Sequence, residues 1–95
     1  MNPLSWDDLK PTEHEALTGA RGRAVYRIHT DDADSIHRMI NIMTPRTYIQ
    51  PHKHENPDKR ELFVCLRGKL VAVEFDDGGA VRSHVVISPT QTHFA

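Results

Sequence analysis

The chain has 95 residues and a mass of 10.8 kDa, enough for one small domain and too little for two hydrophobic cores. Hydrophobic residues make up 38% of it and charged residues 26%, which is typical of a folded domain rather than a disordered chain. Its 12 Lys and Arg against 13 Asp and Glu argue against a general nucleic-acid-binding surface. With a single cysteine, Cys65, and no apolar run long enough to span a membrane, the sequence predicts a cytoplasmic protein without membrane contacts.

The first 20 residues differ in pattern from the rest and predict an N-terminal arm over residues 1–20. Thr12 followed by Glu15 matches a capping box, a pattern that begins many helices, and Gly19 is a residue type that commonly ends one. We therefore expect one short helix in this arm. The segment MNPLSWDDLK is acidic and lacks an apolar stretch, so no signal peptide is expected.

Residues 21–95 have the period-two alternation that is typical of β-strands. Short strands are expected over 25–29, 36–43, 47–50, 61–66, 70–75 and 81–87. Asp76-Asp77-Gly78-Gly79 predicts the turn of a hairpin, and the polar stretch 52–60 predicts a surface loop. Several short strands joined by turns indicate an all-β domain, either a barrel or a sandwich.

Two of the seven histidines, His52 and His54, stand two residues apart, so on extended backbone their imidazoles point to one face. Glu61 begins the next predicted strand, and antiparallel pairing would return its carboxylate to the two imidazoles. This set of side chains suits Zn²⁺, Fe²⁺, Mn²⁺ or Ni²⁺. An isolated H-x-H is more often a pair of solvated histidines, but a carboxylate that opens an apolar strand favours the metal interpretation.

The spacing resembles the first motif of the cupin superfamily: a glycine, five residues, H-x-H, three or four residues, a glutamate, six residues and a glycine. Glu61 and Gly68 match its second half. Arg46 stands where the first glycine is expected, and six residues separate His54 from Glu61. In both departures the chain resembles the WbuC-type small cupin-fold metalloproteins found with O-antigen gene clusters. This resemblance covers roughly residues 20–90 and includes Ile36-His37-Arg38-Met39-Ile40-Asn41, Pro57-Asp58-Lys59 and Phe75-Asp76-Asp77.

The resemblance implies a cupin-type double-stranded β-helix, or jelly-roll barrel, with a divalent metal held by His52, His54 and Glu61. The family's second motif, which supplies another histidine, is expected after about residue 95. His93 follows Pro89 at a distance one residue shorter than the motif has, and no glycine stands at position 91, so a barrel incomplete at its C-terminus is the favoured interpretation. An incomplete barrel would leave an unpaired strand edge, and we therefore expect a homodimer.

The same resemblance implies a metal-binding protein that binds or acts on a small polar, sugar-like molecule, in connection with surface-polysaccharide (O-antigen) biosynthesis. Three roles stay open: a metal-dependent isomerase, epimerase or oxygenase, a non-catalytic binding or sensing module, and a scaffold tied together by the metal. No catalytic residue is assigned, because the chain has no nucleophile elbow, Walker loop or dinucleotide-binding fingerprint.

The other chemistry-bearing residues have structural interpretations. Cys65 is predicted to be a buried, inert thiol. His14 and His84 are predicted to lie on the surface. His29 and His37 are predicted to be hydrogen-bonded or exposed rather than metal ligands, although either would be able to line the pocket.

Overall fold

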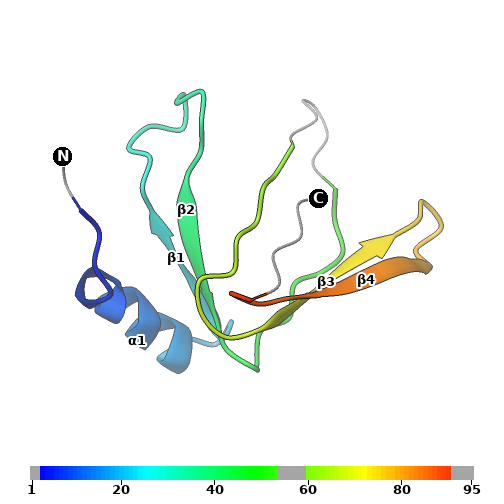
Figure 1. Ribbon diagram of the computed structural model, residues 1–95, viewed down its shortest axis with the longest axis horizontal. Coiled ribbons are helices and arrows are strands. Elements are labelled where there is room, and N and C mark those ends of the chain that lie inside the picture. The colour runs from blue at the N-terminus through cyan, green and yellow to red at the C-terminus, as the bar shows by residue number, and fades with distance from the viewer. Residues whose placement is uncertain (1–2, 54–59, 91–95) are drawn as a thin grey trace. The chain divides into compact units, whose positions relative to one another are not determined.

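The computed structural model describes residues 3–53 and 60–90 (Figure 1). These residues form a single 3₁₀ turn, one helix and four strands: η1 (Asp7–Leu9), α1 (Lys10–Thr18), β1 (Arg23–Arg27), β2 (Met39–Met43), β3 (Leu70–Phe75) and β4 (Val81–Ile87). The strands pair as two separate antiparallel sheets, β1–β2 and β3–β4. The predicted β-rich fold with one short N-terminal helix is confirmed, whereas the cupin-type barrel, incomplete at its C-terminus, stays a prediction.

The chain divides into two compact units, residues 1–50 and residues 51–95. In the first unit, α1 packs against the β1–β2 sheet. Its core is small, and among the described residues its buried hydrophobic side chains are those of Leu9, Ala16 and Ala24. Ile40 and Ile42 of β2 are half-buried and alternate with exposed neighbours, as the period of two predicted.

Helix α1 ends at Thr18 with Gly19 as its C-cap, which confirms the predicted end of the helix. The predicted N-cap at Thr12 is wrong, because the N-cap is Leu9 and Thr12 is a buried residue inside the helix. The 3₁₀ turn η1 leads directly into α1, and Pro11 occupies the first turn, where its missing N–H costs nothing.

Gly22 joins the helix to the sheet of the first unit. Its carbonyl oxygen accepts hydrogen bonds from the amide and the hydroxyl of Thr44, at 3.0 and 2.7 Å, and from the hydroxyl of Thr47 at 2.8 Å. These bonds tie the start of β1 to the segment that follows β2.

The second unit contains the hairpin β3–β4, which the sequence predicted with both strands in place. Leu70 pairs with Ile87 at its open end, and a β-bulge at Glu74/Phe75 precedes the turn. In that turn the Oδ1 atom of Asp76 accepts hydrogen bonds from the amides of Gly78 and Ala80, both at 2.9 Å. The side chain therefore satisfies backbone donors that the two strands leave unpaired.

Two predicted strands are wrong. Residues 47–50 and 61–66 are irregular, although their composition suits a strand. The predicted strand 36–43 is shortened to Met39–Met43, and the strand predicted at 25–29 lies at Arg23–Arg27. Strand propensity describes a residue's fit to a pleated surface. Residues 47–50 and 61–66 have no neighbouring strand to pair with in the described structure, so their composition alone does not make them strands.

Within residues 3–53 and 60–90, no helix combines the length and the apolar character that a membrane span requires.

Candidate metal centre

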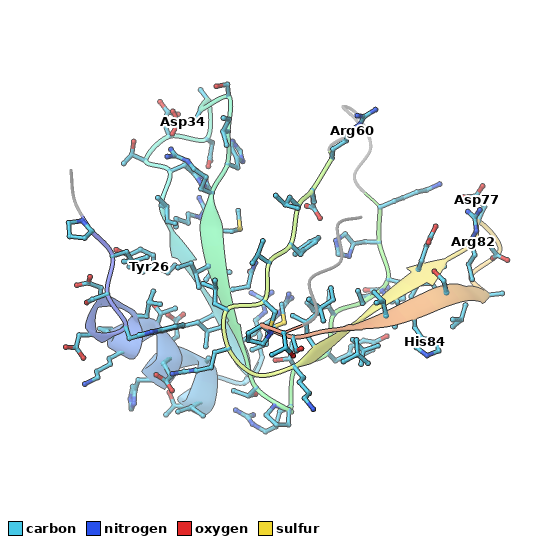
Figure 2. All side chains as sticks on the ribbon, viewed as in Figure 1. Tyr26, Asp34, Arg60, Asp77, Arg82 and His84 are labelled. Atoms are coloured by element: carbon cyan, nitrogen blue, oxygen red, sulfur yellow. The ribbon has the colours of Figure 1, made fainter. Side chains whose placement is uncertain are left out.

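His52 lies in an irregular, exposed segment that follows Pro51. The next residue, Lys53, places its Nζ atom 3.4 Å from Oδ1 of Asp77. Asp77 lies in the turn of the β3–β4 hairpin, at the tip that Figure 2 shows. The ion pair therefore places Lys53, the residue after His52, close to this turn. An exposed pair of this kind stabilises by less than about 1 kcal/mol.

Glu61 is also exposed and opens the segment that leads to Cys65 and Gly68. Cys65 is buried, with 7% of its surface exposed, which confirms the prediction of a buried thiol. Its Sγ atom lies 3.5 Å from the carbonyl oxygens of Arg67 and Gly68 and is able to donate to either. The thiol thus anchors the turn that ends the E-x6-G segment.

Gly68, the glycine of that spacing, has a φ of 79°. This left-handed conformation is strained for residues with a Cβ atom and is readily adopted by glycine. The last position of the E-x6-G spacing is therefore one where the backbone itself favours glycine.

His52 and Glu61 belong to the same compact unit. His54 and His93 lie outside the described residues, so the convergence of His52, His54 and Glu61 on one point stays a prediction. Among the residues that the structure describes, no group of three or more His, Cys, Asp or Glu side chains is placed to hold a metal. The donor types at His52 and Glu61 nevertheless fit a divalent transition metal, because imidazole nitrogen and carboxylate oxygen are among its ordinary protein ligands.

Arg46, at the position where the resemblance to the cupin motif leads one to expect a glycine, has a structural role here. Its Nη2 atom donates to the carbonyl oxygens of Leu17 at 3.0 Å and Gly19 at 3.2 Å. These carbonyls lie at the C-terminal end of α1, where hydrogen-bond acceptors are left over and a cation is favourable. The departure from the motif thus ties the helix to the segment after β2.

His29 and His37 form a pair that sequence reasoning missed. Their rings stack with centroids 4.4 Å apart and an interplanar angle of 11°. The Nδ1 atom of buried His29 lies 3.1 Å from the amide nitrogen and 2.9 Å from the carbonyl oxygen of Arg38, and its bonding depends on the tautomer. His37 Nε2 lies 2.7 Å from the carbonyl oxygen of Asp32. Both rings are hydrogen-bonded, as predicted. Their contact could have been inferred from the sequence, because the two histidines lie on either side of the polar turn 31–34. His14 and His84 are exposed, also as predicted.

Comparison with known proteins identifies a family for the chain. A family model described as "Domain of unknown function (DUF6016)" matches residues 4–87, and the chain belongs to this family. No curated protein and no solved structure matches it.

Proposed function

We propose that this member of the DUF6016 family is a cupin-type metalloprotein that binds a divalent metal ion, Zn²⁺, Fe²⁺, Mn²⁺ or Ni²⁺, through His52, His54 and Glu61. The observation that carries the proposal is the donor types at His52 and Glu61, on either side of residues 54–59, both of them exposed and so accessible to a metal ion from solvent. Two further features support it: the Lys53–Asp77 contact beside the H-x-H motif, and the positive φ of Gly68 at the end of the E-x6-G spacing. In this proposal the strands belong to a double-stranded β-helix.

The proposed ligand is a small polar molecule of sugar type. Two imidazoles and one carboxylate leave coordination positions open, and a bound metal supplies Lewis-acid chemistry at such positions. The chain's part is to present deprotonated imidazole and carboxylate groups, since only these forms bind a metal. The resemblance to cupin proteins found with O-antigen gene clusters supports a role in surface-polysaccharide biosynthesis. The buried free thiol of Cys65 supports a cytoplasmic location.

Metal analysis of protein purified without chelators tests the proposal. The wild-type chain is expected to carry about one metal ion, and His52→Ala is expected to reduce metal affinity at least about tenfold, as losses in a metal's coordination environment do. His84→Ala is the matched control, because His84 is an exposed histidine on β4 outside the motif (Figure 2). Equal metal affinity in wild type and His52→Ala, measured by competition with a chelator, would contradict the proposal.

We also propose that the chain forms a homodimer through the β3–β4 hairpin. The register places Val71 opposite Val86, and Val73 lies on the same face. These valines are 58%, 43% and 42% exposed, respectively. A two-stranded sheet has marginal stability by itself, and a second copy packed on this face would bury the three valines.

Sedimentation at micromolar concentration tests the homodimer. Wild type is expected to sediment as a dimer, and Val71→Glu as a monomer, because a buried unpaired carboxylate is costly. A wild-type monomer at these concentrations would show that the valine face is not a dimer interface.

A further inference from the structure

A hollow of about 390 Å³ lies in the first unit, beside the end of α1 and along β1. Three of its lining residues are arginines, Arg21, Arg23 and Arg27, and Glu15 is the acidic residue among those that line it. Its volume is in the range of pockets that accept small molecules. The hollow is therefore large enough for a compact ligand and carries an excess of positive charge.

The arginines differ in how well they are paired. Arg27 Nη1 lies 3.2 Å from Oδ1 of Asp32 and forms an ion pair with it. Arg23 Nε is buried and has no hydrogen-bond partner in the described structure. Buried donors are nearly always paired, so a small rotation of the Arg23 side chain that turns Nε toward an acceptor in the hollow would relieve an unfavourable state. Arg21 is exposed, and no ion pair is found for it among residues 3–53 and 60–90.

The nearby helix end opposes an anion less than a bare helix C-terminus would. The C-terminus of a helix carries partial negative charge on its free carbonyl groups. Here the carbonyls of Leu17 and Gly19 already accept hydrogen bonds from the Arg46 guanidinium. Among the residues that line the hollow, Glu15 is the one that carries a full negative charge. The guanidinium groups of Arg21 and Arg23 carry two positive charges, and that of Arg27 is paired with Asp32.

We propose that this hollow binds the phosphate group of a small phosphate monoester, with the Arg21 guanidinium and, after a small side-chain rotation, Arg23 Nε as donors to its oxygens. A phosphate dianion offers several acceptor oxygens and two negative charges, which match the fork of donors on arginine. The rest of a sugar-sized ligand would lie along β1. The site is independent of the metal centre, whose described candidate ligands belong to the other unit.

NMR of the Arg Nε–Hε groups of the full chain tests this proposal, with inorganic phosphate, glucose 6-phosphate and acetate as probes. The Arg23 Nε–Hε signal, assigned by triple-resonance spectra, is expected to shift and saturate with both phosphate probes. Acetate, with one charge, is expected to bind at least about fivefold more weakly. An unshifted Arg23 signal, or acetate binding as tight as phosphate, would overturn the proposal.

Variants separate specific binding from general charge attraction. Arg23→Lys keeps the charge and removes Nε, whereas Arg21→Gln removes an exposed charge and so tests the site even if Arg23→Lys does not fold. Each is expected to weaken phosphate binding about tenfold, the effect of losing one charge-assisted hydrogen bond. The matched control is Arg82→Gln, which removes a guanidinium 3.5 Å from Glu74 on the exposed β3–β4 hairpin (Figure 2). An equal loss of affinity in this control would show that binding is nonspecific.

Discussion

Replacing Gly22 by alanine is expected to destabilise the first unit strongly. The residue has a φ of 67°, and an added Cβ would lie 2.9 Å from Thr44 Oγ1 and 3.1 Å from Arg46 Cβ. Thr44 cannot rotate away freely, because its hydroxyl donates to the Gly22 carbonyl. The left-handed conformation costs about 1–2 kcal/mol with a Cβ atom, and overpacking adds about 1–3 kcal/mol. We therefore expect the free energy of unfolding to fall by about 2–5 kcal/mol.

Gly79→Ala is the control for the conformational part of this loss. Gly79 has a φ of 86°, and nothing lies within 4 Å of its would-be Cβ atom. For Gly79→Ala, the expected loss in the free energy of unfolding therefore comes from the left-handed conformation alone and is about 1–2 kcal/mol. Urea unfolding, followed by amide NMR signals from both units, measures the two losses by linear extrapolation. If Gly22→Ala cost no more than Gly79→Ala, the argument from crowding at Thr44 and Arg46 would be refuted.

Three further perturbations follow from the described contacts. Arg46→Ala removes two hydrogen bonds to the end of α1 and should lower the free energy of unfolding by about 1 kcal/mol in the same urea assay, since the guanidinium is exposed. Asp76→Ala removes the acceptor of two turn amides and should cost about 1–2 kcal/mol, most of which Asp76→Asn should restore because it keeps Oδ1. Cys65 should react with a thiol reagent at least about tenfold more slowly in the native chain than in urea, and equal rates would contradict its burial.

The local signals in the sequence were sufficient for the hairpin and for the end of the helix. Asp76 and the two glycines that follow Asp77 determine a turn by short-range chemistry, and the flanking strands need only each other. Gly19 ends α1 for a similarly local reason. Such features are predictable because their partners lie a few residues away.

The features that sequence reasoning missed depend on distant partners. Residues 61–66 have the composition of a strand, yet Leu62 and Val64 are exposed and no strand pairs with them in the described structure. Arg46 appeared as a departure from a motif, and its contact with the end of α1 joins residues far apart in the chain. The stack of His29 on His37 likewise depends on the pairing of β1 with β2, which brings the two ends of the connecting segment together.

For the candidate site, the sequence supplied the ligand types, and the structure adds the common unit of His52 and Glu61. The approach of the three ligands to one another stays a prediction, and His54 lies outside the described residues.

X-ray absorption spectroscopy at the edge of the bound metal tests the three-ligand site most directly. For zinc, we expect a shell of nitrogen and oxygen atoms at about 2.0–2.2 Å, with the outer-shell scattering of two imidazoles and no sulfur at about 2.3 Å. The imidazole scattering should fall in His52→Ala and stay unchanged in His84→Ala. A sulfur shell would assign Cys65 as a ligand instead, and imidazole scattering of undiminished strength in His52→Ala would contradict the proposed site.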